Sequence, residues 1–94
     1  IRRSFALRQL AAFFTVGGDE VKAWTIPKNL PALEAAGVVH SDMQRGFIRA
    51  EVVAFEDLHR AGDHAAARQQ GLVRLEGKTY PVQDGDVIEF RFNI

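Results

Sequence analysis

The sequence predicts an α+β fold, a mixed sheet with short helices packed on one face. Residues 11–16 and 21–26 are both β-prone and flank Gly17-Gly18-Asp19. This pattern is typical of a β-hairpin, because glycine tolerates the positive φ that tight turns need. Near the other end of the chain, apolar residues occupy every second position of residues 87–94: Ile88, Phe90, Phe92 and Ile94. A period of two predicts a strand with one buried face.

Two short helices and a strand are predicted after the hairpin. The first helix covers residues 32–36, and Gly37 can stop it in a left-handed cap. The second helix starts at a cap formed by Ser41 or Asp42 and closes at Gly46. Residues 47–55 follow as a strand on which four residues face one way: Ile48, Ala50, Val52 and Ala54.

The remaining elements complete the predicted order. Helical pieces are expected at residues 56–62 and 63–70, with Asp63 as the cap of the second piece. Short strands then follow at residues 72–76 and 79–82, joined by a tight turn. The order of hairpin, helix, strand, helices and strands fits a β-grasp (ubiquitin-like) sheet.

Composition describes one small globular domain. The chain has 94 residues, of which 47% are hydrophobic and 26% charged, and its formal net charge is 0. Its amino-terminal half is basic and its carboxy-terminal half acidic, so a charged partner can still be oriented locally. Cysteine is absent, which excludes disulfides and thiolate zinc sites. No apolar run approaches the roughly 18 residues of a membrane span, so no membrane partner is expected.

The amino terminus predicts a domain boundary. The chain begins at Ile1, and residues 1–10 have apolar side chains at helical spacing. We therefore expect residues 1–10 to be a connector helix from an upstream domain and residues 11–94 to be the folded domain. The whole would be a fragment of a longer cytoplasmic protein.

No arrangement of residues predicts catalysis or a metal site. Residues 76–79 end like a phosphate-binding loop, but the pattern needs a glycine where Leu72 stands and a helix where a strand is expected. The spacing of His40, His59 and His64 gives no convincing zinc-binding face, and we expect His40 to hydrogen-bond near a helix end. Residues 84–86, Asp-Gly-Asp, are turn formers and lack the further oxygen ligands of a calcium loop.

Binding chemistry is better represented. Lys22 and Trp24 share one face of a predicted strand, and Arg45 and Arg49 flank Gly46-Phe47. Basic residues beside aromatic ones can hold a backbone phosphate and stack a base. The alternative is structural: Trp24 packs in the core, and Arg49 pairs with Glu51 or Asp42. The candidate partner or RNA surface comprises Lys22, Trp24, Arg45, Phe47 and Arg49.

Three stretches resemble one known family. They are residues 23–26, residues 35–52, which carry the pattern Ala-Gly…His…Asp…Gly-Phe-Ile…Ala-Glu, and residues 74–93, which close on Gln-Asp-Gly-Asp-Val…Phe-Arg-Phe-Asn. From about Phe13 to Ile94 the chain is similar to the carboxy-terminal TGS domain of the YchF (Obg-like) ATPases. The matching motif positions, whose roles the resemblance leaves open, are His40, Asp42, Gly46, Phe47, Glu51, Asp84, Gly85 and Asp86.

The resemblance implies a function as well as a β-grasp fold. It implies an upstream domain of the same polypeptide that binds ATP with magnesium, and an association of the parent with ribosomes. This chain would then hold no cofactor or metal and would be a non-catalytic binding or regulatory domain that contacts RNA or the ribosome. The alternative is a stand-alone β-grasp domain that binds RNA or a small ligand.

Overall fold

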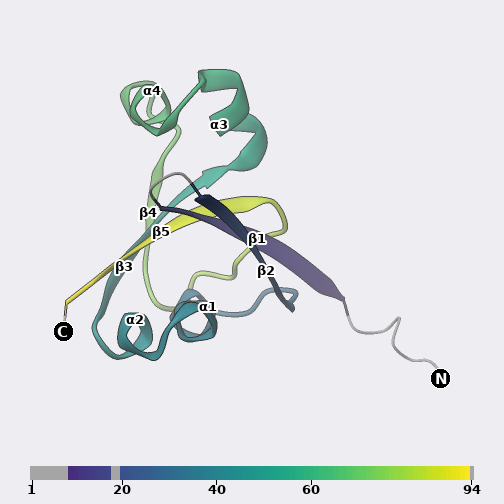
Figure 1. Cartoon of the computed structure of the whole chain (residues 1–94), viewed down its shortest axis with the longest axis vertical. Helices are drawn as coiled ribbons and strands as arrows, with labels where there is room; N and C mark the ends of the chain where they lie inside the picture. The colour runs from purple at the N-terminus through teal and green to yellow at the C-terminus, as the bar shows by residue number, and fades with distance from the viewer. Residues whose placement is uncertain (1–8, 18–19, 94) are drawn as a thin grey trace.

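In a computed structural model, which describes residues 9–17 and 20–93, the strands form one mixed sheet (Figure 1). Its order within the described residues is β2-β1-β5-β3-β4. The bounds are Leu10–Gly17 for β1, Glu20–Pro27 for β2, Phe47–Ala54 for β3, Arg74–Glu76 for β4 and Asp86–Phe92 for β5. The central strands β1 and β5 are parallel, and the other neighbours are antiparallel. This arrangement confirms the predicted α+β class and the β-grasp sheet.

The helices lie on both sides of the sheet rather than on one. Figure 1 shows α1 (Ala32–Val39) and α2 (Ser41–Arg45) on one side, and α3 (Phe55–Ala61) and α4 (His64–Gln69) on the other. Alternation along β5 explains the difference from the prediction. Ile88 belongs to the core beneath α1, whereas its neighbour Val87 packs with Ala67 of α4. Helices could therefore bury apolar residues on either face.

The main core lies between the sheet and α1. Its largest side chains come from four strands and include Phe13, Ile26, Phe47, Val52, Ile88 and Phe90. The ring of Phe13 meets that of Phe90 edge to face, with centroids 6.0 Å apart. A smaller cluster of Val53, Val87 and Ala67 lies on the opposite face, beneath α3 and α4. The predicted connector helix falls largely outside the described residues, although Leu10 is already part of β1.

Two glycines allow close packing around α2. The predicted stop at Gly37 is wrong, because α1 continues through Gly37 to Val39 with no left-handed residue there. A Cβ on Gly37 would instead overlap the flexible amide end of the Gln44 side chain, so glycine leaves room for this side chain of α2 against α1. Gly46 closes α2 as predicted, and a Cβ there would overlap the backbone oxygen of Asn93, next to β5.

His40 caps α2 in place of the predicted Ser41 or Asp42. Its Nδ1 accepts a hydrogen bond from the backbone N–H of Asp42 at 3.0 Å. The expectation that His40 hydrogen-bonds near a helix end is therefore confirmed. The predicted cap of α4 is also confirmed, since the carboxylate of Asp63 accepts from the N–H of Ala66 at 2.8 Å.

The faces of two strands differ in part from the alternating pattern. On β3, Phe47 is buried at 8% exposure and Ile48 is 53% exposed, the reverse of the prediction. The pairing of β3 with β5 shifts register between Phe47 and Arg49, and this irregularity turns Phe47 into the core. On β5, Ile88 and Phe90 are buried as predicted, but Phe92 is 38% exposed.

Residues 79–82 do not form the predicted strand. They make one isolated bridge, between Pro81 and Pro31, and the turn at Gly77-Lys78 leads into a loop rather than a hairpin. The backbone oxygens of Lys78 and Tyr80 instead accept from Leu33 and Ala32, at 3.0 and 2.8 Å. The first N–H groups of a helix lack partners within it, so this loop satisfies the amino terminus of α1.

Candidate functional site

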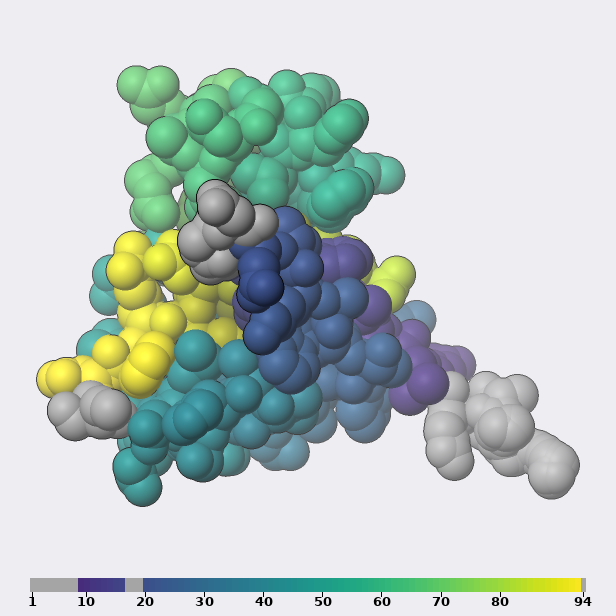
Figure 2. Space-filling model, viewed as in Figure 1, coloured from purple at the N-terminus to yellow at the C-terminus, as the bar shows by residue number. Residues whose placement is uncertain are grey.

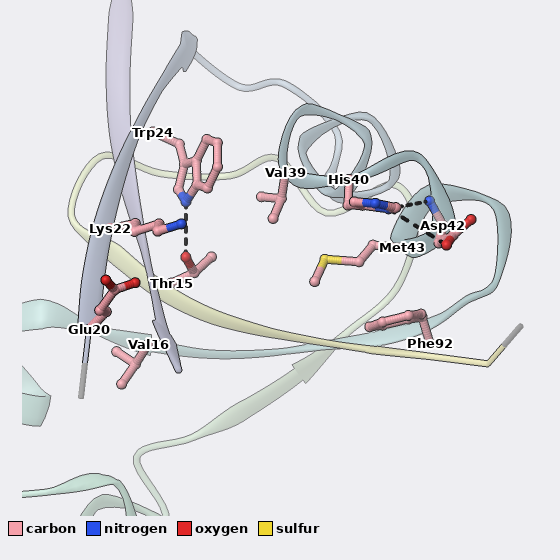
Figure 3. A pocket seen from close by; sticks show the side chains of 10 residues that line it. All are labelled: Thr15, Val16, Glu20, Lys22, Trp24, Val39, His40, Asp42, Met43 and Phe92. Atoms are coloured by element: carbon pink, nitrogen blue, oxygen red, sulfur yellow. Dashed lines mark hydrogen bonds and ion pairs between the residues drawn. The ribbon is translucent and has the colours of Figure 1, made fainter. Parts of the chain in front are cut away.

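A groove opens between the β1–β2 hairpin, the α1–α2 pair and the end of β5. In Figure 2 these parts meet on one face of the molecule, and Figure 3 shows the side chains around the opening. The groove has a volume of about 540 Å³, which is within the usual range for ligand sites. We call it the hairpin groove; it is lined by Thr15, Val16, Glu20, Lys22, Trp24, Val39, His40, Asp42, Met43 and Phe92.

The groove exists because β2 extends past the helices that cover it. Along one face of this strand Ile26 is 1% exposed, Trp24 is half-buried and Lys22 is exposed. Trp24 therefore packs against the core and also forms a wall of the groove. Its Nε1 donates to Thr15 Oγ1 at 2.9 Å, which anchors the indole to β1 (Figure 3). The core packing that the sequence allowed for Trp24 is therefore observed, and the indole also borders the groove.

The far edge of the groove is polar and comes from α2. Asp42, in its first turn, pairs with the guanidinium of Arg45, at 2.6 Å between Nη2 and Oδ1. The Arg45 side chain is 73% exposed. Arg45 is therefore tied to a residue that lines the groove and places a positive charge near its rim. The charged residues of the lining itself are Lys22, Glu20 and Asp42, and Arg45 stands next to it through its pair with Asp42.

The predicted partner surface is divided by the fold. Lys22 and Trp24 lie together, with Arg45 across the groove. Phe47 is buried in the main core, so its ring is not available to a partner. Arg49 lies on the opposite face of the sheet, where its Nη2 is 3.4 Å from Glu51 Oε2. The five residues therefore do not form a single patch.

On that opposite face, three arginines surround one buried carboxylate. Glu51, with a side chain 3% exposed, accepts from Arg68 at 3.0 Å and from Arg91 at 3.1 Å, with Arg49 as its third partner. Burial would raise the pKa of Glu51, but the hydrogen bonds from Arg68 and Arg91 and their charges outweigh it and hold this pKa below its ordinary value. We call Arg49, Arg68 and Arg91 the arginine cluster.

Sequence reasoning anticipated only part of this cluster. The pairing of Arg49 with Glu51 was one of two predicted possibilities, whereas Arg68 and Arg91 were missed. They lie 17 and 40 residues from Glu51 in the chain. The register of β3 with β5, in which Arg49 faces Arg91, brings the strand arginines to one face. The available signal was that Arg49 and Glu51 share one face of a predicted strand and that Arg91 lies on another predicted strand. Using it required knowing that these two strands pair.

The closing Asp-Gly-Asp motif fixes the start of β5. Asp84 Oδ1 accepts from the N–H of Ala12 at 2.8 Å, and Gly85 has a φ of +87° that favours glycine. Asp86, 3% exposed, accepts from the hydroxyl of Tyr80 at 2.6 Å and from the N–H of Gln83 at 2.9 Å. Burial and the bond to Asp86 raise the pKa of Tyr80 to about 12. These motif residues are structural.

The part of the chain that the structure describes has no group of three or more His, Cys, Asp or Glu side chains placed to hold a metal ion. Nor is any helix within 9–17 and 20–93 long and apolar enough to cross a membrane. The fold and the groove together define a β-grasp domain with an open, partly apolar surface.

Comparison with known proteins identifies the family. The model YchF-GTPase_C, described as "Protein of unknown function (DUF933)", matches residues 10–93. The chain therefore belongs to the YchF family and is its carboxy-terminal domain. It is 58% identical to the ribosome-binding ATPase YchF of Bacillus subtilis (strain 168) over 94 residues, which are 100% of this chain and 26% of that protein. It is 51% identical to Obg-like ATPase 1 of Oryza sativa subsp. japonica over 94 residues, 100% of this chain and 24% of that protein.

A solved structure agrees with this assignment. The Schizosaccharomyces pombe YchF GTPase superimposes with a TM-score of 0.82 at 36% identity, over 88% of this chain and 22% of that one. The chain spans about a quarter of the length of the curated relatives it matches. As their carboxy-terminal domain, it is not the part that carries the ATPase site, and the chain itself is not an enzyme.

Proposed function

We propose that this chain is a non-catalytic binding domain through which a YchF-type ATPase contacts RNA on the ribosome. The observation that carries the proposal is the hairpin groove, where the half-buried Trp24 and the exposed Lys22 stand side by side on an uncovered stretch of β2. The chain matches the carboxy-terminal part of its family. This match supports the proposal that the domain works as part of a larger polypeptide, rather than the alternative of a stand-alone domain.

The groove combines the two features that single-stranded nucleic acid requires. A base can stack on the indole of Trp24, and such stacking is worth about 1–3 kcal/mol per base. Lys22 in the lining and the exposed Arg45, which pairs with Asp42 beside it, can contact the phosphates on either side of that base, against the opposing charges of Glu20 and Asp42. Because Trp24 is already held by Thr15, little conformational entropy is lost when a base binds.

The choice of partner comes from the relatives. The Bacillus subtilis protein is named a ribosome-binding ATPase, and ribosomes present extended RNA surfaces. In this proposal ATP and magnesium bind to an upstream domain of the same polypeptide. That domain is also a partner of this chain. The chain itself binds RNA and catalyses no reaction. In this proposal it acts in the cytoplasm, where ribosomes are.

Tryptophan fluorescence tests the proposal directly, since Trp24 is the only tryptophan of the chain. The RNA is single-stranded and roughly 16 nucleotides long, the upper end of site sizes for one small domain. Its addition should quench the Trp24 fluorescence because a base stacks on the indole. Two phosphate contacts predict a log–log salt slope of about −1.4. RNA that binds without any change in Trp24 emission would show that the groove is not the contact.

Charge-reversal variants provide the matched comparison. Lys22→Glu should weaken the quenching and the addition of Arg45→Glu should abolish it, whereas Lys78→Glu, the same single change in the turn after β4, should leave it unchanged. The melting temperature should hardly move, since exposed charges contribute little to stability. Equal RNA affinity in the double variant and the parent would remove the groove from the proposal.

A further inference from the structure

The sheet face opposite the hairpin groove is left partly uncovered. Helices α3 and α4 cover Val53 and Val87, and beyond these residues β3 carries Glu51 and Arg49, β5 carries Arg91, and Arg68 reaches Glu51 from α4. The side chains of Arg49, Arg68 and Arg91 are 46%, 50% and 45% exposed. The three arginines come from β3, α4 and β5, so the tertiary fold assembles a basic surface that no single element carries.

The arginines retain most of their hydrogen-bonding capacity. Each guanidinium has five N–H donors, whereas one carboxylate can accept only about four hydrogen bonds in all. Glu51 is buried and cannot meet a ligand, but it fixes Arg68 through Oε1 and Arg91 through Oε2. The guanidinium groups are thus held in position with donors to spare, as anion recognition requires.

The local charge balance favours an anion. Three arginines face Glu51 and one further acid, Glu89, whose Oε2 is 3.5 Å from Arg91 Nη1. The sum for these five groups is +1, and the exposed acid is Glu89, with a side chain 42% exposed. A hollow of about 360 Å³ lies beside Arg68 and Glu89, between α4 and the strands.

We propose that the arginine cluster binds the phosphodiester backbone of RNA, as a second contact on the face opposite the hairpin groove. The identification of RNA rests on the proposed function; the anion chemistry rests on the cluster itself. Guanidinium groups match phosphate oxygens with paired, planar hydrogen bonds. Glu51 acts as a positioning residue, and Glu89 weakens binding because its charge opposes the phosphates.

Two single substitutions test the proposal in opposite directions. Arg49 is the most distant of the three from Glu51, so Arg49→Gln leaves the hydrogen bonds from Arg68 and Arg91 in place. Loss of one phosphate contact should reduce the salt slope by about 0.7, equivalent to about fivefold weaker binding at ~0.1 M salt. Glu89→Gln removes an opposing charge and should strengthen binding.

The control is Arg60→Gln, the same change on α3, where Arg60 pairs with Asp57 and not with Glu51. Affinity is measured on the full chain by the anisotropy of a fluorescently labelled RNA of roughly 16 nucleotides. This readout is independent of Trp24. Thermal melting of each variant confirms that the fold is retained, and weaker binding by Arg49→Gln with stronger binding by Glu89→Gln supports the proposal.

The contrary outcomes separate the two proposals. If the parent chain binds no RNA in either assay, the proposed function fails. If RNA quenches Trp24 but neither substitution changes affinity, the groove stands and the second contact is wrong. A polyglutamate peptide that displaces the RNA as well as unlabelled RNA does would overturn the choice of RNA as the partner of this face.

Discussion

The two faces of the sheet each bury one carboxylate, and they stabilise it differently. Asp86, on the face under α1, receives the hydroxyl of Tyr80 and a backbone N–H, and its Oδ1 is 3.7 Å from Nη2 of one half-exposed arginine, Arg74. Glu51, on the opposite face, is compensated by three half-exposed arginines. The carboxylate of Asp86 is therefore held mainly by short local hydrogen bonds, with one arginine nearby, and that of Glu51 by three arginines that water and salt can reach.

This difference leaves room for the two proposed binding surfaces, one on each side of so small a domain. The main core is concentrated beneath α1, and the hairpin extends past it to form the groove. The other face has only a small apolar cluster and leaves its arginines at the surface. If this comparison is right, substitutions on the two faces should differ in magnitude and in their response to pH and salt.

The largest effect is expected in the main core. Phe90 is 6% exposed and contacts the rings of Phe13 and Phe47, so Phe90→Ala should cost about 3–5 kcal/mol. The matched control is Phe92→Ala, two residues along the same face but 38% exposed, for which about 1 kcal/mol or less is expected. Denaturant titration measures both, and equal costs would mean that the groove end of β5 is as tightly packed as its centre.

An intermediate effect is expected from Tyr80→Phe. The variant removes a hydrogen bond to a charged, buried group and should cost about 1.5–3 kcal/mol. Because the folded pKa of Tyr80 is about 12 against an ordinary value of 10.0, its contribution is present below pH 10 and lost as pH rises from 10 toward 12. In Tyr80→Phe the free energy of unfolding should therefore decrease less between pH 10 and pH 12 than in the parent. Tyr80 is the only tyrosine, so absorbance reports its titration directly, and ionisation near pH 10 in the folded chain would contradict its bond to Asp86.

The smallest effect is expected from Glu51→Gln. Its arginine partners are half exposed and can be rehydrated, so the loss of about two hydrogen bonds should cost only ~1–2 kcal/mol. The folded pKa of Glu51 lies below its ordinary value of 4.5, so its contribution is present above that pH and lost as pH falls through the folded pKa. The free energy of unfolding of the variant should fall less steeply at acid pH than that of the parent. Unlike that of Phe90→Ala, its destabilisation should depend on salt. Urea titrations at several pH and salt values measure this, and a salt-independent loss above 3 kcal/mol would place Glu51 in the same class as the core.

Local patterns predicted most elements, and the exceptions have physical causes. The hairpin, the break before Asp63 and the buried residues of β5 follow from turn chemistry and a period of two. Gly37 was misassigned because a glycine that stops a helix and one that leaves room for a side chain of the next helix look alike in sequence. Residues 79–82 have the composition of a strand, but their backbone groups are used to satisfy α1. The irregularity at Phe47 leaves no trace in the alternating pattern.

The candidate site divides in the same way. Chain-local chemistry placed Lys22 and Trp24 on one strand face and led to the expectation that His40 hydrogen-bonds near a helix end, although it named Ser41 or Asp42 as the cap of α2. The sequence by itself determined the class of fold, the family and the absence of cysteine chemistry. Only the tertiary structure decided that Arg49 leaves the predicted surface to join Arg68 and Arg91, because strand pairing brings together residues far apart in the chain. It also decided that Trp24 borders a groove, since that depends on how far α1 and α2 reach along β2.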